Sequence, residues 1–382
     1  MDIIVIGAGA SGMMAAISAA RLNNKVTLIE HTKTVGNKLA ITGNGRCNLT
    51  NTDMSTDYFY GDRDFINEVL NSFSIEDTLK FFESIGVYTI NENGYIYPRS
   101  NQAQTVVKAL KNALLNYKVK VKTNNDIKSI KKIDDKFIVD VGIELMCDKL
   151  IIATGGKSYE STGSDGSINP LIEKLGHKII EQKPSLVSLI CNDDILFKSA
   201  AGVRCNVALK LKDKSLRGQL QITNYGISGI CVFNISHLID KETKIVIDFM
   251  DEISKDNFFK FCENMKEGTY GLLLNALFND KLAATFLKKL NLKADDIIDK
   301  NILLNIYEEL SNYKVVCLKT RKFDVAQVTK GGVKTDEINP KTMESKIVPG
   351  LYFCGEIIDV DGYCGGYNLQ FAWSSGFIAG NN

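Results

Sequence analysis

The sequence predicts an α/β protein in which an antiparallel, barrel-like β domain and a small helical domain interrupt a domain built on a parallel sheet. A strand, a glycine-rich turn and a helix follow one another at the N-terminus, and similar strand and turn segments recur near residues 150 and 351. Between them the pattern changes to short alternating strands and then to amphipathic helices. The expected domains are 1–185 with 320–382, 186–250 with 313–319, and 251–312.

The N-terminal segment has the order that a dinucleotide-binding fold requires. A strand at 3–6 precedes the turn "GAGASG", a helix at 13–22 follows it, and a second strand covers 25–29. A GxGxxG spacing alone is weak, but a strand before it, a helix after it and an acidic residue beyond the second strand meet the structural context. The segment therefore predicts a nucleotide cofactor in a Rossmann-like domain.

Each glycine of this turn has its own physical reason. Gly7 permits the tight turn, Gly9 lets the backbone approach a pyrophosphate, and Gly12 lets the helix pack closely on the strand. The free N–H groups at the start of the helix would face the phosphates. Glu30, 23 positions after Gly7, would accept hydrogen bonds from the ribose hydroxyls of the adenosine half and repel a 2′-phosphate.

The segment after the second strand, "HTKTVGNKLAITGNGRCNLTN", predicts a long polar loop in place of the next helix and strand of a nicotinamide domain. Its Gly43, Asn44, Gly45 and Asn48 can bring N–H groups and amides close to an anion or a ring. Arg46 adds a charge that suits a phosphate or a reduced, anionic flavin. We expect this loop to be the second clamp of an FAD molecule.

Two later segments also end a strand in glycine. The strand at 150–153 runs into Thr154, Gly155 and Gly156, at the sheet edge where ligands of open α/β sheets lie. The strand at 351–354 leads through Gly355 and Glu356 to a glycine-rich loop and a helix from about residue 368. The start of that helix would stabilise negative charge on the flavin.

The composition limits the partners. The 382 residues are 45% hydrophobic, and 46 Lys and Arg against 45 Asp and Glu leave a formal charge of +1. This balance offers no electrostatic footprint for nucleic acid or an anionic membrane, so we expect a small-molecule substrate only. The N-terminus predicts a strand rather than a signal peptide and hence a cytoplasmic protein, and no pattern indicates an oligomeric state.

The cysteines and histidines predict no metal site. The nine cysteines form no CxxC pair, and the three histidines lie far apart in the chain. We expect most of the cysteines to be buried small hydrophobic residues in a reducing compartment.

Several motifs together resemble one family. The stretches "GNKLAITGNGRCNLTN", "IATGGKSY", "NYGISG", "VTKGGV" and "DVDGYCGGYNLQFAWSSG" are similar to the bacterial three-domain FAD flavoproteins described as aminoacetone-oxidase-like NAD(P)/FAD-dependent oxidoreductases. That family includes gut bacterial reductases of 3-dehydro bile acids, within a wider group with succinate dehydrogenase-like flavin domains. The resemblance runs over the whole chain.

The resemblance implies a set of residues that line FAD. They are Gly7, Gly9, Ser11, Gly12, Glu30, Lys38, Arg46, Cys47, Asn48, Thr154, Gly155, Gly355, Glu356, Gly366, Asn368, Leu369 and Gln370. A solvated loop charge is an equally good interpretation of Lys38.

The candidates on the substrate side are few. Asn224 and Tyr225 in the inserted region, Lys330 in "VTKGGV" and Tyr363 in the C-terminal loop are candidate substrate anchors or proton donors. Each is also explained as a turn residue or a packing aromatic. The family's pattern leads us to expect histidine at Asn224, and its absence weakens an acid–base role there.

The reaction we expect is that of an FAD-dependent oxidoreductase. A reductase would pass a hydride from NADH or NADPH through flavin N5 to a conjugated C=C, such as an enone or a steroid-like or bile-acid-like acceptor. With no second GxGxxG domain in the sequence, the nicotinamide would bind only transiently. An oxidase of a small amine such as aminoacetone, using O₂ and releasing H₂O₂, stays open, as does a flavin-binding RNA-modifying or redox-sensing protein, which the near-zero charge disfavours.

Overall fold

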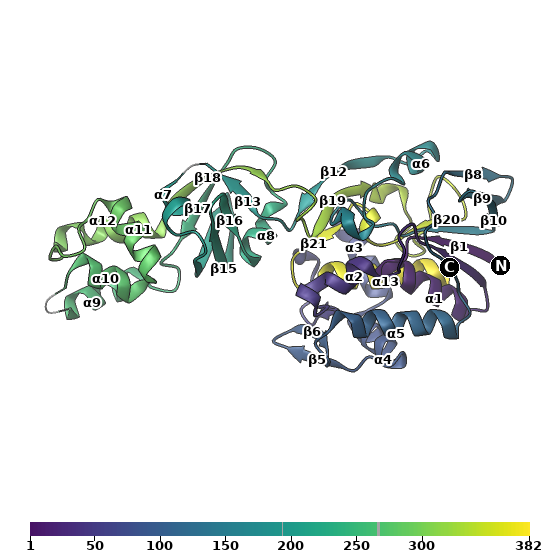
Figure 1. Cartoon of the computed structure of the whole chain (residues 1–382), viewed down its shortest axis with the longest axis horizontal. Helices are drawn as coiled ribbons and strands as arrows, with labels where there is room; N and C mark the ends of the chain where they lie inside the picture. The colour runs from purple at the N-terminus through teal and green to yellow at the C-terminus, as the bar shows by residue number, and fades with distance from the viewer. Residues whose placement is uncertain (193, 266–267) are drawn as a thin grey trace. The chain divides into compact units, whose positions relative to one another are not determined.

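A computed structural model describes residues 1–192, 194–265 and 268–382 of the chain. It divides into two compact units. The first unit is Met1–Ser185 with Phe323–Asn382, and the second unit is Leu186–Lys322. The second unit is thus an insertion into the first, and the chain leaves the first unit after one strand and returns just before another (Figure 1).

The first unit is built on a parallel sheet in the order β20-β11-β1-β2-β7. Strands β1, β11 and β20 are buried over almost their whole length, which explains their continuous apolar sequences, whereas the edge strand β7 is largely exposed. Their bounds are β1 Asp2–Ile6, β2 Lys25–Ile29, β7 Lys120–Lys122, β11 Lys149–Ile152 and β20 Leu351–Phe353. The strands predicted at 3–6, 25–29, 150–153 and 351–354 are confirmed to within a residue, and so is the α/β fold class.

Two helices far apart in the sequence, α1 (Ala10–Arg21) and α13 (Tyr367–Asn381), pack against each other in this unit. Small residues permit the close approach: a Cβ on Gly376 would lie 2.5 Å from the Ser11 carbonyl oxygen, and one on Gly380 would lie 2.3 Å from that of Ala15. The buried Trp373 ring donates to the Leu49 carbonyl at 2.9 Å. Helix α13 is thereby fixed beside the glycine-rich turn that begins α1.

Further helices and 3₁₀ turns complete the helical part of this unit. Their bounds are α2 Asn37–Ile41, α3 Arg63–Ser72, α4 Ile75–Ser84, α5 Ala103–Asn116 and α6 Asn169–Lys174, with 3₁₀ turns η1 Thr42–Gly45, η2 Thr56–Tyr58, η3 Glu160–Thr162, η5 Thr335–Glu337 and η6 Gly355–Ile357. The segment predicted as a long polar loop is therefore wrong in part, because α2 and η1 cover residues 37–45. The left-handed Gly36 (φ 78°) turns the chain into α2, a conformation that favours glycine.

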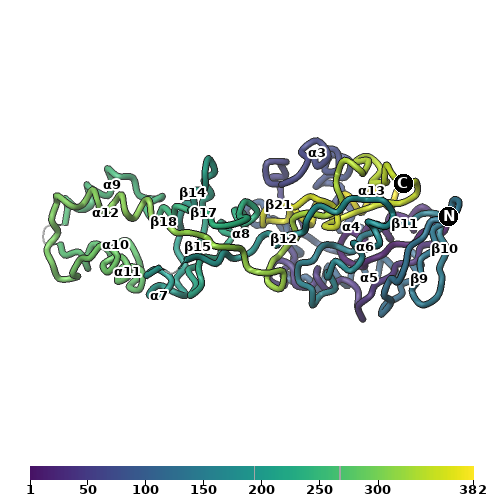
Figure 2. Tube along the Cα trace, turned by 90° about the horizontal axis from the view of Figure 1, so that it is seen from above, coloured from purple at the N-terminus to yellow at the C-terminus, as the bar shows by residue number. Residues whose placement is uncertain are grey.

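Small antiparallel sheets surround the parallel one. They comprise β10-β9-β8 (Glu144–Cys147, Lys136–Asp140, Ser129–Ile133), β3-β6-β5 (Thr50–Asn51, Tyr95–Pro98, Thr89–Glu92), β12-β19 (Ile179–Ser185, Val328–Val333) and β21-β4 (Asp361–Gly362, Phe59–Tyr60). The pair β12-β19 carries the chain out of this unit and back into it. Both chain ends lie in this unit (Figure 2). At the C-terminus, Lys149 Nζ donates to the Asn382 carbonyl.

The second unit holds a closed antiparallel barrel in the order β13-β16-β15-β14-β17-β18, as the alternating segments predicted. Its strands are β13 Leu189–Cys191, β14 Arg204–Leu211, β15 Lys214–Thr223, β16 Gly226–Ser228, β17 Thr243–Asp248 and β18 Tyr313–Thr320. Its helices are α7 Ile195–Ser199, α8 Ile230–Ser236, α9 Lys255–Asn264, α10 Tyr270–Leu277, α11 Asp280–Leu290, the 3₁₀ turn η4 Lys300–Ile302 and α12 Leu303–Ser311.

One core joins the barrel to these helices. Phe249 at the end of the barrel segment packs edge-to-face on Phe286 of α11 at 5.0 Å and on Tyr313 of β18 at 5.7 Å between ring centroids. The barrel and the helices share a continuous cluster of buried apolar residues. The β and helical regions expected as separate domains thus lie within one compact unit.

No helix within the described ranges combines the length and the apolar character that a membrane-spanning segment needs.

Candidate cofactor site

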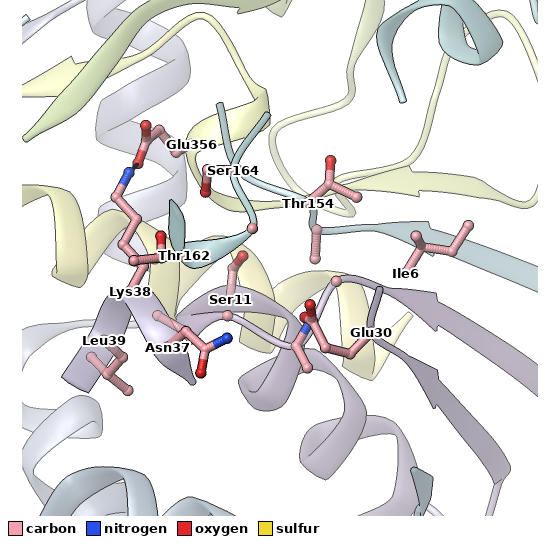
Figure 3. Close-up of a pocket in the computed structure, with 18 of the residues that line it drawn as sticks. Ile6, Ser11, Glu30, Asn37, Lys38, Leu39, Thr154, Thr162, Ser164 and Glu356 are labelled. Carbon is pink, nitrogen blue, oxygen red and sulfur yellow. Dashed lines mark hydrogen bonds and ion pairs between the residues drawn. The ribbon is translucent and has the colours of Figure 1, made fainter. Parts of the chain in front are cut away.

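A cavity of about 330 Å³ opens in the first unit at the carboxyl ends of β1, β2 and β11 (Figure 3). Ten of the residues predicted to line FAD line this cavity: Gly7, Gly9, Ser11, Glu30, Lys38, Thr154, Gly155, Glu356, Asn368 and Leu369. They come from elements that are far apart in the sequence. The parallel sheet and the α1–α13 contact bring them together, at the edge where open α/β sheets bind ligands.

The glycine turn before α1 forms one wall. Gly7 is left-handed (φ 97°), and a Cβ there would lie 2.5 Å from the Ala153 carbonyl oxygen. A Cβ on Gly12 would lie 1.9 Å from the carbonyl oxygen of Gly7, so this glycine is required for packing rather than for the cavity surface. Gly9, by contrast, has no atom within 4 Å of its Cβ position. The backbone at Gly9 is therefore open to a ligand at the start of a helix, which suits a phosphate group.

Glu30 directly follows β2 and is buried, with a relative exposure of 8%. Its Oε2 accepts from the Ala8 N–H at 2.9 Å, and its Oε1 accepts from the N–H and hydroxyl of Thr32 at 2.9 and 2.7 Å. These three donors fix the carboxylate at the wall of the cavity. A carboxylate has lone pairs for further donors, so ribose hydroxyls fit this position.

Lys38 and Glu356 form an ion pair at another wall of the cavity, with Nζ 2.7 Å from Oε2 (Figure 3). The two side chains are only 20% and 19% exposed, and the other Glu356 oxygen accepts from the Thr329 N–H at 2.9 Å. Lys38 is thus a paired cavity residue and not a solvated loop charge. The pair joins α2 to η6 and β19 across this wall.

Thr154 gives a direct test of whether a ligand fits. The residue lines the cavity, and its hydroxyl oxygen is buried and has no hydrogen-bond partner within the described part of the chain. Buried hydroxyl groups are normally satisfied, so a polar ligand group is the expected partner. Together with the open Gly9 backbone and the Glu30 carboxylate as an acceptor, this hydroxyl fits the hydroxyl-rich and phosphate-rich chain of FAD.

Sequence reasoning missed two segments of the lining. Residues 125–127 and 162–168 also line the cavity. His31 Nε2 lies 2.8 Å from the Gly163 carbonyl oxygen, and so ties the end of β2 to this loop. The motif "TGSDG" in the loop was a usable signal, because Gly163 and Gly166 are left-handed, with φ of 106° and 73°.

Seven predicted residues do not line the cavity: Gly12, Arg46, Cys47, Asn48, Gly355, Gly366 and Gln370. Their cofactor contacts remain predictions. Gly355 and Gly366 allow close packing, since their Cβ positions lie 2.3 Å from the Ser11 hydroxyl and 2.6 Å from the Thr50 carbonyl carbon. Gln370 Nε2 donates to the Thr78 hydroxyl at 2.9 Å and links α13 to α4.

Arg46, the expected charge of the second clamp, contacts other protein groups in this structure. Its guanidinium donates to Glu92 at 2.6 Å and to Asn101, and it lies 4.0 Å from the centre of the Tyr97 ring. The side chain is therefore held by the β5-β6 hairpin. Neighbouring Cys47 is buried, and burial raises the pKa of its thiol to about 12. The Asn48 amide oxygen is buried without a partner within the described residues.

The substrate-side candidates lie in three places. Asn224 and Tyr225 form the turn between β15 and β16 of the second unit. Lys330 lies on β19 of the first unit, opposite Lys183. Tyr363 follows β21, where its hydroxyl accepts from Tyr60 at 3.5 Å. These roles stay predictions.

Tyr225 is the candidate with the most distinctive surroundings. Arg321 lies 5.1 Å from its ring centre. Burial raises the pKa of the Tyr225 phenol, but hydrogen bonds from Arg321 and Ser188 outweigh it, so the pKa lies below the ordinary value.

The described residues contain no cluster of three His, Cys, Asp or Glu side chains arranged to hold a metal ion.

A model of the HI0933-like protein Rossmann domain matches residues 1–382. The chain is 39% identical to a 3-dehydro-bile acid delta(4,6)-reductase of Clostridium scindens, over 98% of this chain and 97% of that protein. It is 29% identical to a ribosomal RNA dihydrouridine synthase of Haemophilus influenzae, over 98% and 96%. A solved structure, the 3-ketosteroid-delta4-(5alpha)-dehydrogenase from Rhodococcus jostii RHA1, matches with a TM-score of 0.53 at 13% identity, over 100% and 96%, and supports the fold.

The fold, the cavity and these relatives define an oxidoreductase of the FAD-dependent class. Within that class, the chain belongs to the HI0933-like family. The family resemblance of the glycine-rich motifs is thereby confirmed.

Proposed function

We propose that this protein is an FAD-dependent reductase that adds two hydrogens across a C=C bond conjugated with a carbonyl group, with NADH or NADPH as the electron donor. The observation that carries the proposal is the 39% identity, over 98% of the chain, to a relative named for reducing a 3-dehydro bile acid. A 3-oxo steroid-like enone is therefore the first substrate class to test.

The lining of the cavity supports FAD as the cofactor. The N–H groups at the start of α1, beside Gly9, would hold the pyrophosphate. Glu30 would accept the ribose hydroxyls, and the Thr154 hydroxyl would gain the partner that it otherwise lacks. When bound, FAD supplies hydride transfer between a nicotinamide and an organic acceptor.

Reduction of a conjugated C=C also requires a proton, because a hydride added at the β carbon leaves negative charge on the α carbon and the carbonyl oxygen. Tyr225 is our proposed donor. Its hydrogen bonds from Arg321 and Ser188 stabilise the phenolate that proton donation leaves behind. Tyr225→Phe is expected to lower kcat by roughly 10²-fold or more. The matched control is Tyr307→Phe, because the Tyr307 hydroxyl only donates to the Ile253 carbonyl at 3.0 Å.

A second candidate function has its own observation. The relatives named ribosomal RNA dihydrouridine synthase, from Haemophilus influenzae and Escherichia coli, are each 29% identical over 98% of the chain. Uridine also contains a C=C conjugated with a carbonyl, so the bond chemistry would be the same. The lower identity and the formal charge of +1 favour the small molecule over RNA.

An anaerobic absorbance titration tests these proposals in one series. NADH or NADPH should bleach the flavin band, and a 3-oxo-Δ4 steroid acid should restore it with formation of a product two hydrogens heavier. Restoration by a uridine-containing ribosomal RNA fragment, but not by the steroid, would transfer the proposal to RNA. Bleaching by aminoacetone alone, with H₂O₂ on admission of air, would overturn the reductase in favour of the amine oxidase.

A further inference from the structure

Two cysteines of the second unit lie directly opposite each other where the barrel closes. Cys191 on β13 is the cross-strand partner of Cys317 on β18. The next pair is hydrogen-bonded, since Asn192 N–H donates to the Val316 carbonyl at 2.8 Å. The Cys191 N–H instead donates to the Tyr225 carbonyl at 3.0 Å, on the other side of β13. The cysteines therefore occupy a non-hydrogen-bonded position, beside a register shift between Ile190 and Cys191. In a regular ladder the Cα atoms of such a pair approach to about 4.5 Å.

That separation lies within the range that a disulfide bond spans, about 4.4–6.8 Å between Cα atoms. The two side chains are close enough to affect each other's pKa. Both residues are buried, with relative exposures of 7% and 0%. Because both residues are buried, only a small oxidant can reach the two thiols.

The two sulfur atoms differ in their surroundings. Interaction with the Cys191 side chain lowers the pKa of Cys317 against the opposing effect of burial. The Cys317 thiol donates to the Lys319 carbonyl oxygen at 3.7 Å. Because the thiolate is the nucleophile in thiol oxidation, Cys317 is the sulfur that reacts first.

We propose that Cys191 and Cys317 are a modification site at which hydrogen peroxide forms an intramolecular disulfide bond. The Cys317 thiolate attacks one peroxide oxygen, the O–O bond breaks, and a sulfenic acid and hydroxide result. The Cys191 sulfur then displaces the sulfenic hydroxyl, the S–S bond forms, and the Cys191 proton leaves with that hydroxyl as water. The two sulfurs together lose two electrons to the peroxide, and two water molecules are released once the hydroxide takes up the proton that Cys317 had lost.

The bond would act on the barrel and on one predicted substrate residue. Strands β13 and β18 pair at the seam between the first and last barrel strands, so the bond would cross-link residues that are far apart in sequence. It would also fix the backbone of Cys191, whose N–H holds the turn at Tyr225. This inference does not depend on the identity of the substrate.

A second cysteine pair provides an internal control. Cys205 and Cys231 are close enough for the charge of one to affect the other. However, Cys205 on β14 pairs with Leu220, and the Cys231 thiol donates to the Gln219 carbonyl at 3.5 Å. Cys205 and Cys231 are therefore not cross-strand partners, and proximity without the cross-strand geometry should give no bond.

The test treats the folded, full-length protein with increasing hydrogen peroxide, alkylates the remaining thiols in denaturant and maps the peptides by mass spectrometry. The expected result is a linked peptide pair containing Cys191 and Cys317, lighter by two hydrogen atoms, formed before any link between Cys205 and Cys231. Linkage of Cys205 to Cys231 first, or Cys317 in sulfinic form without a link, would overturn the proposal.

Two variants sharpen the order of steps. Cys191→Ala removes the resolving sulfur, so Cys317 should accumulate as a sulfenic acid that dimedone traps and then overoxidise. Cys231→Ala should leave the link between Cys191 and Cys317 intact. If Cys191→Ala fails to fold, the wild-type peptide map still decides. Absence of the dimedone adduct on Cys317 in a folded Cys191→Ala protein would contradict Cys317 as the attacking sulfur.

Discussion

Two glycine-rich segments of the first unit, residues 7–12 and 43–48, differ in what they do for the cavity. The first lines it through its backbone, at Gly7 and Gly9. The second does not line it, and its Arg46 side chain is held by Glu92 and Tyr97 instead. A glycine turn acts through backbone geometry that local sequence dictates. A long arginine side chain can reach several partners, and tertiary contacts decide among them.

The largest expected effect is on stability and comes from Gly12, which is needed for packing, whereas Gly9 is needed for ligand binding. Gly12→Ala would place a Cβ 1.9 Å from the Gly7 carbonyl oxygen and should destabilise the first unit by about 3 kcal/mol, with loss of flavin. Gly9→Ala meets no atom within 4 Å and should keep its unfolding free energy within about 1 kcal/mol, yet bind FAD at least tenfold more weakly. Urea unfolding and flavin occupancy measure both. Equal losses of stability in the two variants would contradict the distinction.

Glu30→Gln tests the carboxylate that follows β2. The amide keeps one acceptor but loses the charge that Ala8 and Thr32 orient. We expect FAD to dissociate with a Kd roughly 10- to 100-fold higher, because hydrogen bonds to charged groups contribute about 1.5–3 kcal/mol. Reconstitution of the apoprotein with FAD measures this. The exposed Glu160 is the control, and an equal effect of Glu160→Gln would mean that net charge, not position, matters.

The pair of Lys38 and Glu356 is expected to have a smaller effect. Lys38→Met leaves a largely buried carboxylate that still accepts from the Thr329 N–H, and it should cost roughly 1–2 kcal/mol of stability. Adding Glu356→Gln should recover part of that loss, and a double-mutant cycle measures the coupling. The exposed pair of Lys80 and Glu76 should show no measurable coupling, so coupling of equal size there would refute the importance of burial.

The parallel sheet and the wall around the glycine turn could be predicted because both depend on local pattern. Continuous apolar strands and the spacing of Gly7, Gly9 and Gly12 each constrain the backbone directly. The barrel was likewise evident from short alternating strands such as those of β14 and β15. The shared core of barrel and helices was not evident, because the contacts of Phe249 with Phe286 and Tyr313 join residues distant in sequence.

The rest of the lining depends on contacts between distant segments. The loop at 162–168 reaches the cavity because His31 contacts the Gly163 carbonyl, and no local pattern reports that pairing. The pairing of Lys38 with Glu356 joins residues 318 positions apart, which left a solvated lysine equally reasonable from the sequence. The segment at 37–45 was expected as a loop, because its glycines and asparagines hide the short helix α2.

Arg46→Ala should have the smallest effect. It tests whether the glycine-rich segment at residues 43–48 contributes to flavin binding. The structure holds the guanidinium against Glu92 on β5. Both side chains are more than a third exposed, at 35% and 40%. Exposed ion pairs contribute little, so we expect full flavin occupancy and only a slightly lower urea midpoint. Glu92→Gln is the matched control, since it breaks the same pair from the other side. Should Arg46→Ala lose flavin while Glu92→Gln retains it, the arginine would act on the cofactor after all, as the motif first suggested.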